Sequence, residues 1–134
     1  MPKDQNDVLN LMEYSQKNSI PLLARGGGSS QCGQTVGESI VLDYSKYQNQ
    51  ILELNVEEKY VWVQPGIVLD TLNAYLKPYG LWFPVDVSTS SRATIGGMTG
   101  NNSCGSRSLY YGNMVNNVLA VEAILDDGTI HTFE

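Results

Sequence analysis

The chain has 134 residues, of which 42% are hydrophobic and 16% charged, and its net charge is −6. That length suits one domain with a hydrophobic core, and the composition argues against a disordered chain. Because no cluster of lysines and arginines accompanies the negative charge, we expect binding to neither nucleic acid nor an anionic membrane surface.

Targeting and cysteine signals are sparse. No window contains the roughly 18 apolar residues that a transmembrane segment needs. The N-terminus lacks the apolar region of a signal peptide, so we expect a cytoplasmic protein, with peripheral attachment to the inner membrane left open. Cys32 and Cys104 are interpreted as free thiols of a reducing compartment, and one disulfide between loops is the alternative.

The N-terminal part of the chain has the pattern of a helix, a strand and a glycine-rich loop. Residues 4–17 carry apolar residues at helical spacing, with Asp4 as a candidate N-cap. The continuous apolar run 20–24 predicts a short strand that is buried on both faces. This strand leads directly into residues 25–30, and such a layout is typical of an α/β ligand site.

The middle of the chain predicts three further strands and a second helix. The strands cover residues 39–43, 51–55 and 59–64, and a short polar turn joins the last two into a hairpin. After Pro65 and Gly66 a helix follows, and its apolar stripe is formed by Val68, Leu72, Tyr75, Leu76 and Tyr79.

The C-terminal part contains an irregular segment and a hairpin. Residues 83–111 are rich in Ser, Thr, Asn and Gly and show little periodicity, and so long an irregular segment is usually functional. Residues 118–125 predict a strand, and Asp126, Asp127 and Gly128 predict the turn into a return strand. Because this edge strand ends with the chain, we expect a domain that is truncated at its C-terminus.

The sharpest chemical signal is the glycine loop, residues 25–30, Arg-Gly-Gly-Gly-Ser-Ser. Three consecutive glycines permit positive φ and a close approach to a ligand, so successive N–H groups can converge on an anion. Ser29 and Ser30 add hydroxyl donors, and Arg25 adds a charge-assisted partner. The loop is neither a P-loop nor a G-x-G-x-x-G turn that opens a helix. A flexible turn without a ligand is the alternative.

A second segment, residues 93–105, combines small residues with amides, and we call it the small-residue segment. It can pass close to a flat aromatic ligand, while its N–H groups and amides hydrogen-bond the polar edge of that ligand. A merely polar surface loop would not explain Ile95, Met98 and the paired glycines.

Five short segments occur in an order and spacing that are typical of one flavoprotein family. They are residues 21–30, 41–43 (Val-Leu-Asp), 62–66 (Trp-Val-Gln-Pro-Gly), 83–86 (Phe-Pro-Val-Asp) and 93–97 (Ala-Thr-Ile-Gly-Gly). Together they closely resemble the PCMH-type FAD-binding domain of the vanillyl-alcohol-oxidase/MurB-like FAD-linked oxidases. Within that superfamily the chain is most similar to the branch that contains the D-type subunit of glycolate oxidase and the D-lactate and D-2-hydroxyglutarate dehydrogenases.

The resemblance implies that loops of this chain bind FAD, with Arg25 as the charged partner of the phosphates. Carried over by position, the contacts are to the pyrophosphate (Gly26, Gly27, Gly28, Ser29 and Ser30, with Gln34 near them), to the dinucleotide from a second loop (Pro84, Asp86 and Ser90), to the isoalloxazine and its surroundings (Thr94, Gly96, Gly97, Asn102, Gly105, Tyr111 and Gly112) and to the adenine side (Val118). No residue of this chain is assigned a catalytic or metal-binding role.

The resemblance also implies an α+β fold, with a small parallel lobe at residues 1–56, the start of an antiparallel lobe at 57–134, and FAD between them. The parent enzyme would oxidise a 2-hydroxy acid by hydride transfer from its α-carbon to the flavin. The remaining segment of the FAD domain and a cap domain would supply the other contacts, so this chain alone is expected to be inactive.

Two departures from the family pattern refine these expectations. Members with covalent flavin often carry histidine where Ser29 stands, so the cofactor is expected to be non-covalent FAD. Residues 101–105, Asn-Asn-Ser-Cys-Gly, resemble a subgroup of large dehydrogenases with a C-terminal iron–sulfur module, and any such cluster would lie outside this chain.

Several interpretations stay open. Tyr110 and Tyr111 are either core or flavin-shielding aromatics, and Arg107 either faces the pocket or caps a loop. His131 is interpreted as structural or exposed. One alternative function is a related flavoenzyme with another substrate, such as a sugar-acid or aldonolactone oxidase or a MurB-like reductase. The other is a catalytically silent fragment of an FAD domain.

Overall fold

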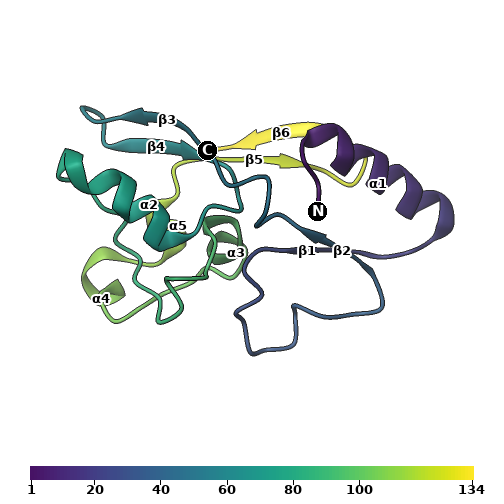
Figure 1. The fold of residues 1–134 in the computed structure, drawn as a ribbon, viewed down its shortest axis with the longest axis horizontal. Coiled ribbons are helices and arrows are strands. Elements are labelled where there is room, and N and C mark those ends of the chain that lie inside the picture. The colour runs from purple at the N-terminus through teal and green to yellow at the C-terminus, as the bar shows by residue number, and fades with distance from the viewer.

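The computed structural model describes residues 1–134 as short helices and strands joined by long loops (Figure 1). In chain order the elements are α1 (Gln5–Asn18), β1 (Leu22–Arg25), β2 (Ile40–Asp43), β3 (Ile51–Asn55), β4 (Tyr60–Val63), α2 (Leu69–Leu76), the 3-10 helix η1 (Lys77–Tyr79), α3 (Ile95–Gly100), α4 (Ser108–Tyr111), α5 (Met114–Asn117), β5 (Val121–Ile124) and β6 (Ile130–Phe133). The strands pair as three separate two-stranded sheets. No helix has the length and hydropathy needed to span a bilayer.

The N-terminal helix and the first sheet follow the sequence pattern with one exception. The Asp7 N–H donates to the Asp4 carboxylate at 3.0 Å, so the predicted N-cap of α1 is confirmed. Strands β1 and β2 pair in parallel, and residues 26–39 connect them without a helix. The expectation of burial on both faces is wrong, because nothing in this chain covers Ala24, which is exposed.

The β3–β4 hairpin and α2 enclose the first of two apolar clusters. Leu72 and Leu76 of α2 are buried there, and Val61 and Val63 of β4 pack against them. The predicted hairpin and the second helix are therefore confirmed. The two strands pair across the predicted lobe boundary at residue 56, and the division into two lobes stays a prediction.

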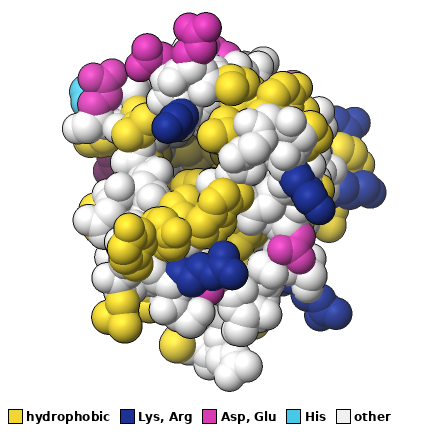
Figure 2. All heavy atoms as spheres, turned by 90° about the vertical axis from the view of Figure 1, so that its left-hand side faces the viewer, with side chains coloured by type: hydrophobic (Ala, Val, Ile, Leu, Met, Phe, Trp, Pro, Cys, Tyr) yellow, Lys and Arg dark blue, Asp and Glu magenta, His cyan; other side chains and the backbone are white.

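The face of the molecule that carries α2 and α4 exposes many apolar side chains (Figure 2). Tyr75 and Tyr79 belong to the predicted stripe of α2, yet they are 42% and 49% exposed. These two tyrosines of the stripe are not buried in this chain, because the buried face of α2 runs along Leu69, Leu72 and Leu76. Further exposed apolar residues of this part of the chain are Trp82, Leu109, Tyr110 and Tyr111.

The second cluster buries residues from the segment that the sequence predicts to be irregular. Its buried members are Leu69, Val85, Ala93, Met98 and Met114. The prediction of an irregular segment over residues 83–111 is wrong in part, because α3 and α4 form within it. Three of the six residues of α3 are glycines, so its intrinsic helix propensity is poor. Burial of Met98 and a side-chain cap hold this helix instead.

The C-terminal hairpin is confirmed, with a shorter first strand than predicted. The Leu125 N–H donates to the Thr129 carbonyl at 2.8 Å, and Gly128 adopts a φ of 82° in the turn. β5 begins only at Val121, because the N–H of Val118 closes the last turn of α5 on the Met114 carbonyl. Figure 1 shows this hairpin beside α1.

Candidate functional site

The glycine loop and the small-residue segment meet in the structure. A Cβ atom on Gly26 would overlap the side chain of Thr94, and a Cβ atom on Gly27 would overlap the backbone carbonyl of Arg92. Only glycine permits so close an approach of two chain segments. The glycine loop and the small-residue segment, which are 60 to 70 positions apart in the sequence and were predicted to bind one ligand, are therefore packed together.

Packing, and not unusual backbone geometry, explains the first two glycines of the loop. Only Gly28 has a positive φ, 62°, so the expectation that the triplet supplies positive φ is wrong for Gly26 and Gly27. Ser29 continues the contact between the two segments, since its hydroxyl lies 3.4 Å from the Thr89 hydroxyl. The path of the loop is thus set by the segment against which it packs.

The backbone N–H groups of the glycine loop have no partners inside the chain. None of the N–H groups of residues 26–31 donates a hydrogen bond to another group of the protein. Gly27 and Gly28 are exposed, and Ser29 and Ser30 are half-buried. Successive free N–H groups around a turn with one left-handed residue form an anion-binding concavity. The loop can therefore hold a phosphate group through its backbone.

Arg25 is committed to another partner. Its guanidinium pairs with the Asp43 carboxylate at 2.8 Å, and its buried Nε has no hydrogen-bond partner. Burial raises the pKa of Asp43, but hydrogen bonds from Ser45 and Arg25 and the Arg25 charge outweigh burial, so the pKa lies below its ordinary value. A Cβ atom on Gly28 would lie 3.5 Å from the Arg25 side chain. Arg25 thus lies beneath the loop as a support.

The start of α3 is fixed by the turn between β4 and α2. Thr94 is buried and caps α3, accepting the Gly97 N–H at 3.3 Å. The Gly96 N–H donates to the Pro65 carbonyl at 2.8 Å, and a Cβ atom on Gly96 would collide with Pro65. A Cβ atom on Gly97 would meet only the Thr94 hydroxyl, at 3.2 Å. Thr94 and Gly96 therefore fix the start of α3, and at Gly97 a side chain would crowd the Thr94 hydroxyl.

A hydrogen bond ties the far end of the β1–β2 connection to the turn after α3. The Gln34 amide donates to the Asn101 side chain at 3.1 Å. Both residues are exposed, so this contact lies at the surface of the chain. Cys32 and Cys104 lie close to it in sequence, and both are exposed free thiols in the structure.

Asp86 holds the loop that precedes α4. Its carboxylate accepts the Ser106 hydroxyl at 2.7 Å and the Arg107 N–H at 3.0 Å, and the Arg107 Nε lies 3.8 Å away. These hydrogen bonds lower the pKa of Asp86 below its ordinary value, the Arg107 N–H contributing most. Gly105 packs against the Asp86 carbonyl, where a Cβ atom would overlap it. Asp86 and Gly105, both predicted to be cofactor contacts, clamp this loop together.

Removal of the Asp86 carboxylate should therefore loosen residues 105–107. In Asp86→Ala the Arg107 N–H loses its acceptor, so its amide hydrogen exchanges faster, by roughly tenfold. Exchange in the β3–β4 hairpin serves as the internal control and should not change. Unchanged exchange at Arg107 would show that the carboxylate does not hold the loop.

Three more of the predicted residues support backbone structure around α5. Asn102 has a φ of 45°, and its side-chain oxygen accepts the Val115 N–H at 3.0 Å. Gly112 has a φ of 82°, a left-handed conformation that favours glycine. Val118 packs against the second apolar cluster. Their contacts within the chain are accordingly structural, and their predicted contacts with FAD stay predictions.

The structure places the aromatic pair and Arg107 at the surface of this chain. Tyr110 is 85% exposed and Tyr111 is 42% exposed, so neither belongs to the core of this chain. Tyr111 meets Trp82 edge-on, with ring centroids 5.2 Å apart. The Arg107 guanidinium lies 5.2 Å from the Trp82 ring centroid and also reaches Asp86, and Arg107 lines a pocket together with Trp82.

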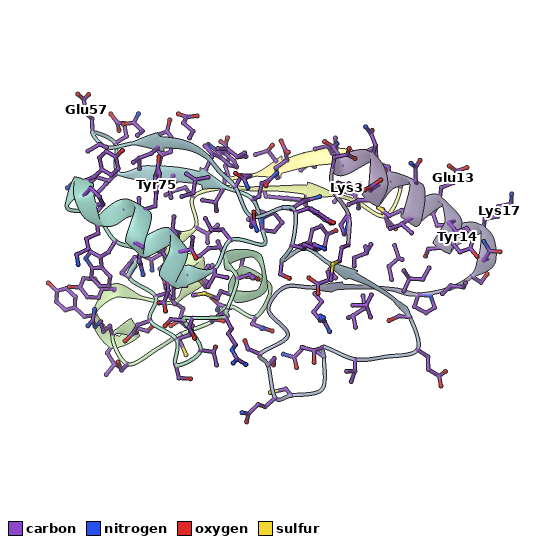
Figure 3. The ribbon with its side chains drawn as sticks, in the orientation of Figure 1. Lys3, Glu13, Tyr14, Lys17, Glu57 and Tyr75 are labelled. Carbon is purple, nitrogen blue, oxygen red and sulfur yellow. The ribbon has the colours of Figure 1, made fainter.

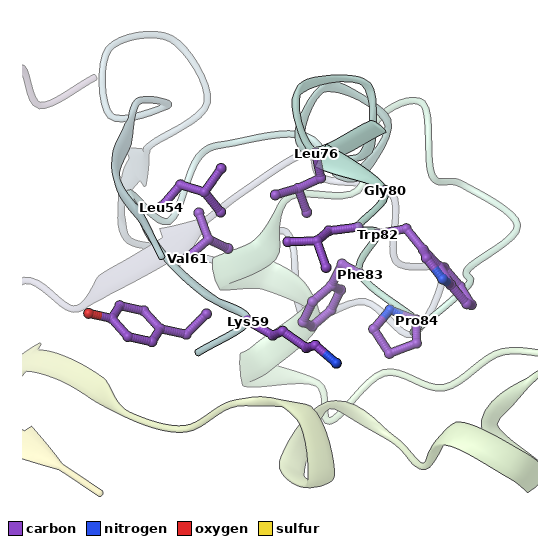
Figure 4. A pocket seen from close by; sticks show the side chains of 10 residues that line it. Leu54, Lys59, Val61, Leu76, Gly80, Trp82, Phe83 and Pro84 are labelled. Atoms are coloured by element: carbon purple, nitrogen blue, oxygen red, sulfur yellow. The ribbon is translucent and has the colours of Figure 1, made fainter. Parts of the chain in front are cut away.

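A separate pocket of about 260 Å³, which the sequence pattern did not indicate, lies between β4 and the segment after α2 (Figure 4). Its lining is mostly apolar and includes Trp82, Phe83 and Pro84, with Lys59 also lining it. Pro84 is the only predicted cofactor contact in that lining. Ser90 lies elsewhere, where its carbonyl accepts the Asp70 N–H at the start of α2 at 3.2 Å.

A family model described as an FAD binding domain matches residues 1–134 of this chain. The chain belongs to the FAD-binding domain family. It is 48% identical to a D-2-hydroxyglutarate dehydrogenase of Haemophilus influenzae over 135 residues, which cover 96% of this chain and 13% of the relative. It is 38% identical to the mitochondrial cytochrome-dependent D-lactate dehydrogenase of Kluyveromyces lactis, covering 96% of this chain and 23% of the relative. It is 34% identical to the glycolate oxidase subunit GlcD of Bacillus subtilis, covering 96% of this chain and 28% of the relative.

Solved structures show the same fold. The 6-hydroxy-D-nicotine oxidase of Arthrobacter nicotinovorans superposes with a TM-score of 0.85 at 17% identity, covering 98% of this chain and 28% of that one. An alkyldihydroxyacetonephosphate synthase gives a TM-score of 0.82 at 23% identity, covering 99% of this chain and 24% of that one. These structures confirm the predicted α+β fold, while the family model and the relatives confirm the predicted branch of the FAD-binding domain family and FAD as its cofactor. The individual FAD contacts stay predictions.

Proposed function

We propose that this chain holds FAD non-covalently, as the cofactor-binding part of a longer flavoenzyme that oxidises a 2-hydroxy acid. The observation that carries the proposal is the row of free N–H groups at residues 26–31, packed against Thr94 at the start of α3. The names of the relatives support the substrate class, and the chain spans only 13% to 28% of the lengths of the three relatives described above.

The residues present fit FAD in two respects. The glycine loop offers backbone donors for the pyrophosphate, and the lack of a side chain at Gly97 lets a flat ring approach the backbone of α3. When bound, FAD supplies the acceptor for the hydride that leaves the α-carbon of the substrate. This chain binds and orients the cofactor, and the substrate groups would come from outside it.

Further segments of a longer protein would complete the site. Val121, Ile130 and Phe133 of the C-terminal hairpin are exposed, as are the apolar residues of the face with α2 and α4. We propose that the rest of the FAD domain and a cap domain cover these surfaces, with residues 1–56 and 57–134 as parts of two lobes around FAD. A C-terminal iron–sulfur module and a cytoplasmic location remain parts of the same proposal.

Titration of the purified chain with FAD tests the proposal. We expect flavin absorption to co-purify with the protein and flavin fluorescence to change on binding. Acid precipitation should leave the flavin in the supernatant, because Ser29 stands where members of the family with covalent flavin often carry histidine. A colourless chain that takes up no added FAD would favour the silent fragment, and flavin that stays with the precipitate would refute non-covalent binding.

A pair of substitutions in α3 tests the place of the flavin. Gly97→Val places a branched side chain against the Thr94 hydroxyl and over the backbone that the flavin would approach, so we expect FAD affinity to fall roughly tenfold or more. Gly100→Val is the matched control, since nothing lies within 4 Å of a Cβ atom there. Equal FAD affinity of the two variants would contradict a flavin beside Gly97.

A further inference from the structure

A pyrophosphate carries negative charge that backbone N–H groups offset only in part, so a cation near the glycine loop would strengthen binding. Arg25, the cation expected from the sequence, already neutralises Asp43 at 2.8 Å. Its charge is therefore not free for a ligand. A free cation for the ligand would have to come from a residue whose backbone lies against the loop.

The turn at residues 89–92 is the segment held against the glycine loop. The Arg92 N–H donates to the Thr89 carbonyl at 2.8 Å, which closes this turn. The Thr89 hydroxyl lies 3.4 Å from the Ser29 hydroxyl, and the Arg92 carbonyl is in contact with Gly27. Both ends of the turn thus touch the loop, and the backbone of Arg92 is fixed beside the free N–H groups.

The Arg92 side chain is uncommitted. Arg92 is exposed, and no ion pair or side-chain hydrogen bond within the chain involves its guanidinium. The other cations lie on other segments: Arg107 pairs with Asp86, Lys46 lies over the Tyr47 ring, and Lys3 and Lys17 lie at the two ends of α1 (Figure 3). Lys59 belongs to the β3–β4 turn and Lys77 to the end of α2.

We propose that Arg92 is the cation that binds the pyrophosphate group at the glycine loop. The inference rests on the proposed function, and it extends that function by a residue that the sequence pattern did not indicate. A guanidinium matches phosphate oxygens with two parallel N–H donors, so arginine is better suited than lysine to this role. Arg25 then acts as a support beneath the loop, and Arg92 supplies the charge above it.

Binding of FAD and of inorganic pyrophosphate to Arg92→Gln, Arg92→Lys and Lys17→Gln tests this inference. Loss of one positive charge takes the net charge from −6 to −7 in both glutamine variants, which makes Lys17→Gln a matched control. We expect Arg92→Gln to weaken the binding of both ligands about tenfold, Arg92→Lys to weaken it less, and Lys17→Gln to leave it unchanged. The salt dependence of FAD binding should also become shallower in Arg92→Gln.

The outcomes separate the two proposals. Wild-type affinities in Arg92→Gln would overturn the role of Arg92 while FAD binding stands. A lowered unfolding temperature of ligand-free Arg92→Gln, with an unchanged salt dependence, would show a structural role and overturn the inference. If the wild type binds pyrophosphate and not FAD, the proposed function fails and the anion site stands. If the wild type binds neither, both proposals are overturned.

Discussion

Gly27→Ala will lower the FAD affinity of this chain roughly 100-fold, because the added methyl group pushes the two halves of the site apart. Its Cβ atom would overlap the Arg92 carbonyl, which is backbone and cannot turn aside as a flexible side chain could. Overpacking of this kind costs about 1–3 kcal/mol of stability. FAD titration and urea unfolding measure the two effects separately.

Gly37→Ala is the control for this prediction, since it lies in the same β1–β2 connection. A Cβ atom there would meet only the Ser39 hydroxyl, at an ordinary 3.7 Å. We expect Gly37→Ala to keep wild-type FAD affinity within about twofold. If Gly27→Ala binds FAD as well as Gly37→Ala does, the interlocked packing of the two segments is not needed for binding.

Asp43→Ala will destabilise the fold by about 2–3 kcal/mol at neutral pH. The Asp43 side chain is 11% exposed and accepts hydrogen bonds from Arg25 at 2.8 Å and from the Ser45 hydroxyl at 2.6 Å. Its removal leaves a partly buried guanidinium without a counter-charge directly beneath the glycine loop. The Arg25 side chain is 38% exposed, so solvent screens part of the loss, and the upper values for fully buried pairs do not apply.

The same pair gives stability a defined pH dependence. Because folding lowers the pKa of Asp43, the unfolded chain binds the proton more readily, and stability rises with pH across the interval between the two pKa values. The contribution is complete above the unfolded pKa of about 4 and is lost as pH falls through the folded pKa. The difference in unfolding free energy between wild type and Asp43→Ala should therefore become smaller as the pH falls below about 4.

Glu57→Ala is the control for Asp43→Ala, because Glu57 lies at an exposed turn at the tip of the β3–β4 hairpin (Figure 3). Glu57→Ala removes one carboxylate and so changes the net charge as Asp43→Ala does, but it leaves no charged partner behind. We expect its unfolding free energy to stay within about 0.5 kcal/mol of wild type. An Asp43→Ala variant as stable as Glu57→Ala would show that the ion pair contributes nothing.

In the site as a whole, the charged residues and the glycines mainly hold the loops in place. Asp86 and Gly105 clamp the loop before α4, Gly26 and Gly27 let two segments touch, and Arg25 lies beneath the loop. What remains free for a ligand is largely backbone, at residues 26–31. Binding by this chain should therefore depend more on the path of the main chain than on any one side chain.

Local sequence signals determined several helix ends, hairpins and loops of this protein. The N-cap at Asp4, the β3–β4 hairpin and the turn at Gly128 depend on residues close together in sequence, and their chemistry can be read directly. The glycine loop was recognisable for the same reason, since a glycine triplet after an apolar run is a local pattern. These features, and the order of the family motifs, could be predicted from the sequence alone.

Tertiary contacts decided the rest. α3 is rich in glycine and has poor helix propensity, so only burial of Met98 and the Thr94 cap make it a helix. The partners of Arg25 and Gly27 are 18 and 65 residues away along the chain, and no local pattern reports such distances. The glycine loop was readable as an anion site from its own residues. Which of its groups stay free for the anion follows only from what the fold packs against them.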